Sequence, residues 1–331
     1  MTSIARSVPT AGGPSRAARW RRKNLTFDKV SFALVFLGAP LVLYVALVLS
    51  PFVQAIAYSL TSWTGFDTSM TFIGLQNYVN AFNDATFLIS VRNSVTLVLV
   101  LPIVVIALAL ILASLVTIGG ASSGPVRGVR GGEFYRIVLF FPYIIPAIAV
   151  GIMWGQIYDP SNGLLNGVLT SLGLSGFASY PWLGDTRTAM IATMFVMIWA
   201  SVGFYMVIFV AAIKALPAEV YEAARLDGAG RARILLQVTI PMLRPTIRTS
   251  LIYTGIFALD AFVFMAALNP GGGPANSTLV ISQELFKTAF TKGQFGLACA
   301  MGVVLAGITL LFAAIVFLVD RLTGGREVQG E

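Results

Sequence analysis

Long stretches of apolar residues recur along the whole chain and limit the folds that it can adopt. The first runs from 32 to 53, and no charged residue occurs between Val30 and Phe66. A helix needs about 20 apolar residues to cross the hydrocarbon core of a bilayer. Six stretches reach that length, at about 32–53, 93–118, 137–158, 188–213, 249–268 and 294–319. The sequence therefore predicts an all-α protein with six transmembrane helices.

The composition excludes an ordinary soluble domain. Of 331 residues, 57% are hydrophobic and 11% are charged, whereas soluble domains carry about 25% charged residues. A net charge of +8 would suggest nucleic-acid binding in a soluble protein. Here the basic residues flank the apolar stretches, where they act as orientation signals at a membrane surface. We expect membrane lipid, and no nucleic acid, as a partner.

The chain contains no His and a single Cys, Cys299. These counts exclude a Cys/His zinc site, a His-based catalytic triad and an intrachain disulfide. Cys299 lies in an apolar run, where a cysteine is typically a small packing residue. No metal site, cofactor or catalytic residue is therefore expected.

The first apolar stretch has to be distinguished from a secretory signal peptide, because Ala55-Ile56-Ala57 resembles a cleavage site. The hydrophobic region of a signal peptide is only about 7–15 residues long, and this stretch has 22. We therefore expect it to be the first span. The basic, Ser- and Gly-rich residues 1–29 are expected to form a flexible cytoplasmic tail.

The distribution of Lys and Arg predicts the orientation in the membrane. If both termini and the even-numbered loops are cytoplasmic, the cytoplasmic segments hold 18 Lys and Arg residues and the external loops hold 4. This asymmetry follows the rule that basic residues stay inside. We expect a multi-pass transmembrane domain at 30–322 and a cytoplasmic tail at 323–331.

The loop between the fourth and fifth spans, residues 219–241, is the one long polar interruption with a helical pattern. Good helix formers precede Gly228, which stands where a helix often ends with a left-handed cap. A second short helix is expected from 231 to 238, ended by Pro241. Ala223 and Ala224 would leave a flat patch between Glu222 and Asp227. The pattern fits a docking surface, and it also fits a solvated loop that only turns the chain.

Glu222-Ala223-Ala224, Gly228 and Val238-Thr239-Ile240-Pro241 resemble, in order and spacing, the EAA signature of permease subunits of bacterial ABC importers. The departures are Val238 for Ile and Ile240 for Leu. The resemblance implies a type I importer permease in the bacterial inner membrane, with 219–241 as its coupling loop. In that family the coupling helix sits in a cleft of the ATP-hydrolysing subunit. The implied ATPase-coupling residues are Glu222, Ala223, Ala224, Asp227, Gly228 and Pro241.

Further segments resemble the carbohydrate-uptake branch of that family, and together they cover about residues 30–320. They are Phe72–Tyr78, Leu226–Ala229, Asp260–Phe262, Gly272–Pro274 and Ala298–Met301. The resemblance implies three kinds of protein partner: two copies of an ATPase, a second permease and an extracytoplasmic binding protein that delivers a sugar. The segments 254–274 and 298–303 resemble members thought to carry N-acetylglucosamine or its oligomers.

The sequence contains no G-x-x-x-x-G-K-[ST] motif for binding ATP phosphates. We therefore expect a transport subunit that is not an enzyme and that depends on a partner for ATP hydrolysis. One alternative is an ion-coupled secondary transporter, but such proteins usually need several ionisable residues within the spans. A membrane-embedded enzyme is a further alternative, although the chain shows no paired carboxylates and no nucleophile elbow.

Polar groups within spans are costly in lipid and usually face a cavity. Asp260 is the only ionisable residue of the fifth span, and it is expected to share a helix face with Thr249 and Tyr253. Aromatic rings and hydroxyls suit neutral sugars. The candidate substrate-path residues are Tyr143, Ser201, Tyr205, Tyr253 and Asp260. The alternative is that these groups bond to neighbouring helices or to the backbone.

Overall fold

A computed structural model describes residues 31–32, 34–67, 70–118, 128 and 131–323. Within these residues the regular structure is helical, with one isolated antiparallel bridge between Thr61 and Phe72. The prediction of an all-α protein is confirmed. The basic tail expected at 1–29, and residues 324–331 of the C-terminal tail, lie outside the described residues. The chain divides into two compact units between Gln54 and Ala55.

The first unit contains most of one continuous apolar helix. The helix begins with η2 (Leu34–Gly38), continues through α2 (Ala39–Tyr44) and η3 (Val45–Leu49), and ends with α3 (Ser50–Tyr58). None of its residues is buried in the chain. Exposed leucines and valines along 25 residues are what lipid would solvate.

The second unit contains the other membrane-crossing candidates. Three further helices are long and apolar enough to span a bilayer, and two bent helix pairs pass the same test when each pair counts as one span. With Leu34–Tyr58, the described part of the chain then holds six spans. The second-unit helices are α4 (Gln76–Asn83), α5 (Ala85–Ile118), α6 (Gly132–Ile144), α7 (Ala147–Ile157), α8 (Leu164–Ser171), α9 (Ala189–Lys214), α10 (Ala218–Leu226), α11 (Arg231–Ile234), η5 (Leu235–Thr239), α12 (Ile240–Met242), α13 (Arg244–Leu259), α14 (Phe262–Leu268), α15 (Ile281–Phe286), η8 (Lys287–Thr291) and α16 (Phe295–Thr323); three short 3₁₀ turns are η4 (Ser175–Phe177), η6 (Pro270–Gly272) and η7 (Pro274–Asn276).

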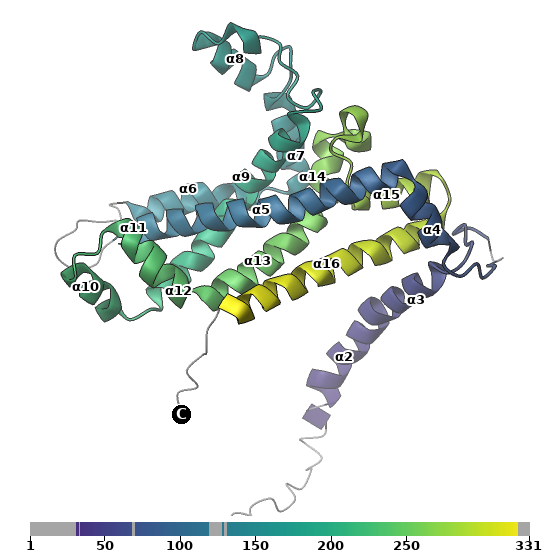
Figure 1. The fold of residues 1–331 in the computed structure, drawn as a ribbon, viewed down its shortest axis with the longest axis horizontal. Coiled ribbons are helices and arrows are strands. Elements are labelled where there is room, and N and C mark those ends of the chain that lie inside the picture. Colours follow the sequence, from purple (N-terminus) through teal and green to yellow (C-terminus); the bar gives the residue numbers. More distant parts are fainter. Residues whose placement is uncertain (1–30, 33, 68–69, 119–127, 129–130, 324–331) are drawn as a thin grey trace, which may run out of the picture. The chain divides into compact units, whose positions relative to one another are not determined.

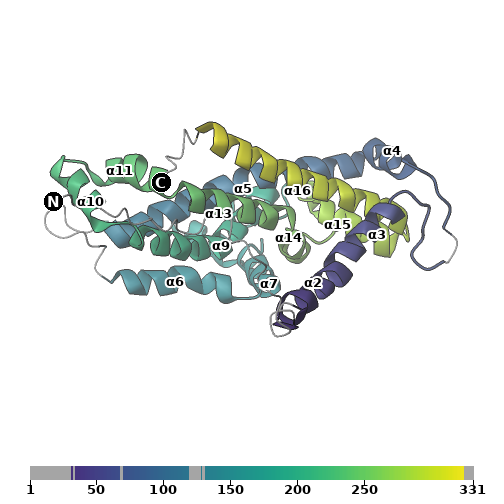
Figure 2. The ribbon, with the colours of Figure 1, turned by 90° about the horizontal axis from the view of Figure 1, so that it is seen from below.

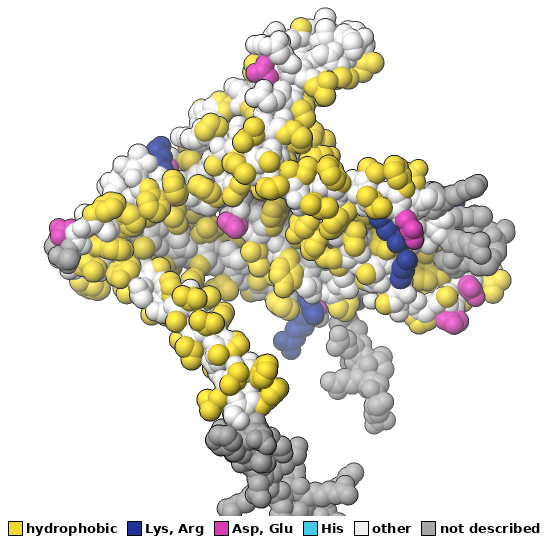
Figure 3. Space-filling model, turned by 180° about the vertical axis from the view of Figure 1, so that it is seen from behind, with side chains coloured by type: hydrophobic (Ala, Val, Ile, Leu, Met, Phe, Trp, Pro, Cys, Tyr) yellow, Lys and Arg dark blue, Asp and Glu magenta, His cyan; other side chains and the backbone are white. Residues whose placement is uncertain are grey.

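The long helices of the second unit pack side by side. Helix α9 packs against α5 and α6, and α13 packs between α5 and α16 (Figures 1 and 2). A Cβ at Gly203 of α9 would overlap the carbonyl oxygen of Leu139 in α6, so a glycine is needed for the two backbones to approach this closely. The surface seen from behind the view of Figure 1 is mostly apolar. Figure 3 shows hydrophobic side chains spread over the helices there, with few charged side chains among them.

Two spans are bent where the sequence breaks their helices. Helices α6 and α7 meet at 98°, and α13 and α14 meet at 45°. The first bend lies at Ile145 and Pro146, because Ile145 takes the extended conformation that a following proline favours. Pro142 lies inside α6 and does not end it.

The segment between α14 and α16 folds back against the start of α5. The side-chain amide of Asn93 donates to the backbone oxygens of Asn276 (3.1 Å) and Leu279 (2.9 Å). The backbone N–H of Ile281 donates to the Ser94 hydroxyl (3.1 Å). These bonds hold α15 against α5 at the end of the long helices opposite to α10 and α11 (Figure 1).

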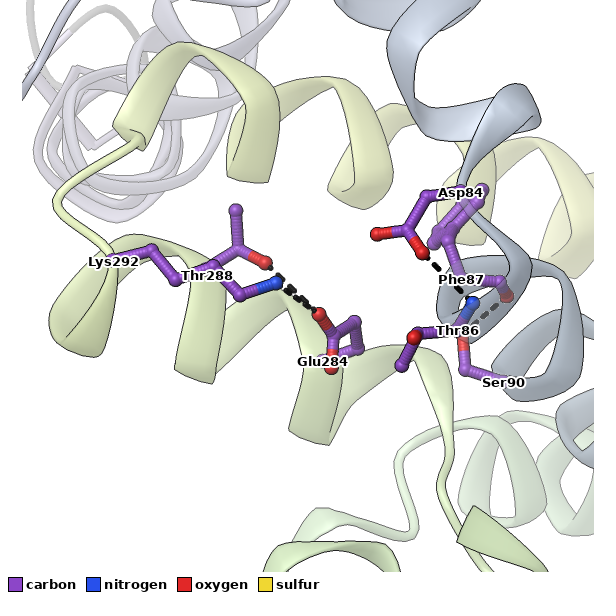
Figure 4. A network of polar contacts seen from close by, with 7 residues as sticks. All are labelled: Asp84, Thr86, Phe87, Ser90, Glu284, Thr288 and Lys292. Carbon is purple, nitrogen blue, oxygen red and sulfur yellow. Dashed lines mark hydrogen bonds and ion pairs between the residues drawn. The ribbon is translucent and has the colours of Figure 1, made fainter. Parts of the chain in front are cut away.

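An ion pair between a buried carboxylate and a partly exposed lysine stabilises this segment. The Glu284 side chain is fully buried, and its Oε1 accepts from Lys292 Nζ (2.7 Å) and from the Thr288 hydroxyl (3.3 Å). Figure 4 shows both donors aimed at the carboxylate, beside the start of α5, where Asp84 accepts from the backbone N–H of Thr86. A buried carboxylate is tolerated only when it is paired and hydrogen-bonded.

Replacing Lys292 with methionine is expected to lower the free energy of unfolding by about 1–3 kcal/mol, because it leaves the Glu284 carboxylate buried without its cation. Thermal unfolding of the purified protein measures this. The matched control is Lys287→Met, which removes an exposed lysine from the same segment. The double change Glu284→Gln and Lys292→Met should recover most of the loss. Equal melting temperatures for the two single variants would contradict this role of the pair.

Candidate functional site

The 219–241 loop begins with α10, which ends in a left-handed cap at Gly228. Gly228 has φ +75°, as its position predicted. The N–H of Gly228 bonds to the oxygen of Arg225 (3.0 Å), and the N–H of Ala229 bonds to the oxygen of Ala224 (2.9 Å). This pair of bonds is the Schellman arrangement, which satisfies the carbonyl groups left open at a helix end.

One face of α10 is fixed to the helical body. Tyr221 and Ala224 are buried, and burial raises the pKa of the Tyr221 phenol. The Tyr221 hydroxyl lies 3.5 Å from the Thr239 hydroxyl, and Arg225 Nη2 donates to the backbone oxygen of Ile118 (3.1 Å). The second bond joins α10 to the end of α5. A displacement of α10 would therefore be transmitted to α5 through the bond between Arg225 and Ile118.

The opposite face of α10 is open to solvent. It carries Glu222, Ala223 and Asp227, together with Leu226, whose side chain is 89% exposed. The flat patch expected from two alanines is therefore only half present, because Ala224 packs into the core. Leu226 was missed as a candidate. Its signal is its position, three residues beyond Ala223 on the same helix face.

The second half of the loop differs from the expected short helix. Helix α11 covers only Arg231–Ile234, and the wider turn η5 follows it. Pro241 does not end the helical stretch, because it stands at the start of α12. Helical turns run without a break from Arg231 to Met242, and Pro241 follows directly after the wider turn η5.

A cavity of about 640 Å³ lies between α6, α9 and α13, and we call it the aromatic cavity. Four of the five candidate path residues line it: Tyr143 from α6, Ser201 and Tyr205 from α9, and Tyr253 from α13. The remaining lining residues are Phe204, Ile208, Pro245, Thr246, Thr249, Ser250 and Phe257.

The chemistry of the aromatic cavity is apolar and uncharged, with hydroxyl groups. The rings of Tyr143 and Phe204 stack with centroids 4.4 Å apart and planes 17° apart. Tyr253 is 64% exposed. No residue in the lining carries a charge. Such a site suits a neutral ligand that offers apolar faces to rings and polar groups to hydroxyls.

Asp260, the fifth candidate, does not line the aromatic cavity. Helix α13 ends at Leu259, and Asp260 is the residue that follows its last turn. The N–H of Asp260 still bonds to the oxygen of Ile256 (2.9 Å), and Asp260 is exposed, as Thr249 and Tyr253 are. The cavity lining on α13 ends at Phe257, before Asp260 is reached. On α9, the Thr193 hydroxyl accepts a hydrogen bond from the side-chain amide of Asn269 (2.7 Å).

Metal chemistry gains no support from the part of the chain that the structure describes. Its His, Cys, Asp and Glu residues form no group of three that could hold a metal ion. The candidate residues described above form two sites. One is the exposed face of α10 at one end of the long helices, and the other is the aromatic cavity between α6, α9 and α13.

The sequence is similar to those of known proteins along most of its length. Residues 90–324 match the model of the binding-protein-dependent transport system inner membrane component. The diacetylchitobiose uptake system permease protein NgcF of Streptomyces coelicolor is 54% identical over 97% of this chain and 93% of its own length. The multiple sugar-binding transport system permease protein MsmF of Streptococcus mutans is 31% identical over 82% of this chain and 88% of its own length.

The fold is also found in a solved structure. A chain of the bacterial alginate ABC transporter, crystallised in complex with an alginate pentasaccharide-bound periplasmic protein, superposes with a TM-score of 0.75. The match covers 92% of this chain and all of that chain, at 18% sequence identity. At that identity the likeness shows the fold, and it leaves ligand and partners to be argued from this chain's own residues.

Proposed function

Since the chain belongs to the binding-protein-dependent transport system inner membrane components, and is a permease subunit, we propose that it forms part of the sugar path of an ATP-driven importer. The observation that carries the proposal is the aromatic cavity. Tyr143, Ser201, Tyr205 and Tyr253 come from three spans and meet around one uncharged space. Sugar hydroxyls would bond to its polar groups, and the faces of the sugar rings would stack on its aromatic side chains.

The proposed substrate is a mono- or oligosaccharide built from N-acetylglucosamine. Two observations support this class. The relative with 54% identity is named for the uptake of diacetylchitobiose, a disaccharide of that sugar. The lining carries no charge that would select an acidic or basic sugar, and an acetamido group is neutral with an apolar methyl. A secreted binding protein would deliver the sugar and supply much of the selectivity.

The proposed motor is a pair of separate ATPase subunits, one of which binds the exposed face of α10. The support comes from the residues of that face: Glu222, Ala223, Leu226 and Asp227 are solvent-exposed, while Tyr221 anchors the helix from below. A second permease would supply the rest of the path, because this chain provides only the α6, α9 and α13 side of it. Both termini are proposed to be cytoplasmic, on the asymmetry of Lys and Arg.

Replacing Leu226 with aspartate is expected to weaken ATPase binding by about tenfold or more, because Leu226 is 89% exposed on α10 and would be buried in the contact. Co-purification of the ATPase with the tagged permease measures this. Leu226→Met should retain binding. The matched control is Leu322→Asp, which alters a leucine that is 75% exposed at the end of α16. Equal loss in both aspartate variants would contradict a specific contact at α10.

Uptake of labelled sugars by a deletion strain tests the proposed substrate. Cells that regain the gene should accumulate labelled diacetylchitobiose, and cells without it should not. Cellobiose, which has the same linkage and lacks the acetamido groups, is the matched control and should not be accumulated. Uptake of cellobiose without diacetylchitobiose would overturn the substrate class, while leaving the permease assignment intact.

A further inference from the structure

Two buried serines from different helices line the aromatic cavity. Ser201 comes from α9 and Ser250 comes from α13, and each residue is 3% exposed. The sequence predicted Ser201 as a path residue and did not predict Ser250. Because both hydroxyls are removed from bulk solvent, their hydrogen bonds within the chain decide what each can offer to a ligand.

The Ser201 hydroxyl is committed to its own helix. It donates to the backbone oxygen of Met197 (2.7 Å), which lies four residues earlier. Such a bond is common for Ser and Thr side chains inside helices. It is also made by the hydroxyls of Thr96, Thr117, Thr193, Thr249, Thr254 and Thr309. Since a hydroxyl has one proton to donate, Ser201 faces the cavity only as an acceptor.

Ser250 departs from this pattern. Its hydroxyl makes no hydrogen bond with any residue that the structure describes, although its backbone oxygen accepts from the Thr254 hydroxyl (2.7 Å). A buried polar group without a partner is destabilising. Water would satisfy the hydroxyl while the cavity is empty, and a ligand that displaces this water has to replace its hydrogen bond. Ser250 is therefore a donor that is available to a ligand.

The cavity around Ser250 has a polar side and an aromatic side. Thr246 and Tyr253 lie about one turn to either side of Ser250 on α13 and line the same cavity. On α6 and α9 the cavity presents the stacked rings of Tyr143 and Phe204. This arrangement fits a ligand that turns polar groups toward α13 and an apolar surface toward the two rings.

We propose that the Ser250 hydroxyl binds the transported sugar by donating a hydrogen bond to the carbonyl oxygen of an acetamido group. This contact presupposes the sugar path proposed above, and it favours N-acetylglucosamine over plain glucose units. A carbonyl oxygen only accepts hydrogen bonds, so Ser201 cannot serve it and Ser250 can. The hydroxyl oxygen of a glucose unit is a weaker acceptor, and a site that leaves a buried donor poorly paired discriminates against such a ligand.

Thiol labelling of the assembled transporter tests this contact without measuring uptake. The chain has one cysteine, so Cys299→Ser provides a background in which Thr246→Cys adds the only thiol of this chain. Thr246 lines the cavity and leaves Ser250 intact. Diacetylchitobiose should slow the reaction of Thr246→Cys with a small methanethiosulfonate reagent, as measured by mass spectrometry of this chain. The sugar concentration that halves the rate reports the affinity of the cavity.

Three serine variants are then added to the reporter chain. Ser250→Ala should raise the half-protecting concentration about fivefold, the factor that corresponds to about 1 kcal/mol, a typical net contribution of one hydrogen bond. Ser201→Ala should raise it less, because that hydroxyl bonds to its own helix. The matched control is Ser114→Ala, which removes a hydroxyl that is 7% exposed in α5 and does not line the cavity, and it should change nothing. Melting temperatures show whether each variant is folded.

Cellobiose, added directly in place of diacetylchitobiose, tests the acetamido group. With Ser250 present, cellobiose should need at least a fivefold higher concentration for the same protection. Ser250→Ala should reduce this difference, because the variant loses the donor that distinguishes the two sugars. Equal protection by the two sugars when Ser250 is present would overturn the proposal.

The proposal is also overturned if Ser250→Ala and Ser114→Ala have the same effect, or if Ser201→Ala costs as much as Ser250→Ala. Failure of the proposed function has a separate readout, since the unaltered chain would then not restore diacetylchitobiose uptake in the deletion strain. Normal uptake by the unaltered chain, together with unchanged protection in Ser250→Ala, would exclude the Ser250 contact and leave the permease function in place.

Discussion

Replacing Gly228 with valine is expected to reduce transport by tenfold or more while leaving the membrane helices inserted. Gly228 has φ +75°, which a β-branched residue adopts only at a cost of about 1–3 kcal/mol. A Cβ at this position would meet no other atom within 4 Å, so the cost lies in the backbone alone. The end of α10 would rearrange, and the two bonds that close its cap would be lost.

Gly230 supplies the matched control, because it lies two residues further along the same loop. It has φ −70° and ψ 168°, an extended conformation that valine accepts, and a Cβ there also meets nothing within 4 Å. Gly230→Val should therefore keep most transport and ATPase binding. Uptake of labelled sugar and co-purification of the ATPase measure both effects. A Gly228→Val protein that transports normally and retains its ATPase would show that the cap does not shape the contact.

Replacing Tyr253 or Tyr143 with alanine is expected to lower uptake at limiting sugar by about tenfold. Both residues line the aromatic cavity, and in the isolated chain they are 64% and 46% exposed. A ring that is exposed inside a membrane protein offers an apolar face to a passing sugar. Loss of one stacking surface of this kind corresponds to about 1–2 kcal/mol.

Two further variants test whether the aromatic ring of Tyr253 or its hydroxyl supports sugar uptake, and whether the effect is specific to the cavity. Tyr253→Phe keeps the ring and removes the hydroxyl, so it should retain most uptake if stacking dominates. Tyr135→Ala removes a tyrosine that is 48% exposed on α6 and does not line the cavity, and it should leave uptake unchanged. Uptake that is normal in both Tyr253→Ala and Tyr143→Ala, at normal protein levels, would exclude the aromatic cavity as the path.

The lengths of the apolar runs predicted much of the fold. The fourth stretch was expected at 188–213, and α9 covers Ala189–Lys214. The second was expected to begin at 93, but α5 begins at Ala85. Hydropathy alone could not extend that helix, because its first turns carry the polar residues Thr86, Ser90 and Arg92.

The 219–241 loop shows which structural features a local sequence pattern predicts and which it does not. The cap at Gly228 follows from local backbone geometry, so the sequence predicts it. The burial of Ala224 and the exposure of Leu226 depend on which face of α10 meets the body. That face is decided by the anchors at Tyr221 and Arg225, whose partners are distant in sequence.

Asp260 shows the same limit for the substrate path. Helical spacing placed it with Thr249 and Tyr253, and all three residues are exposed. The cavity lining on α13 nevertheless ends at Phe257, so a shared helix face does not bring Asp260 into the cavity. The residues that do meet in the aromatic cavity come from three spans, and helix packing, which the spacing in one span cannot encode, brings them together.

The most direct test of the account is sugar accumulation by proteoliposomes. The vesicles contain either this chain alone or this chain with its second permease and ATPase, and the loaded binding protein is added outside. Labelled diacetylchitobiose should accumulate only in vesicles with the complete set and with ATP on the ATPase side. Accumulation by this chain alone under an imposed ion gradient, without ATP, would contradict the account and identify a secondary transporter.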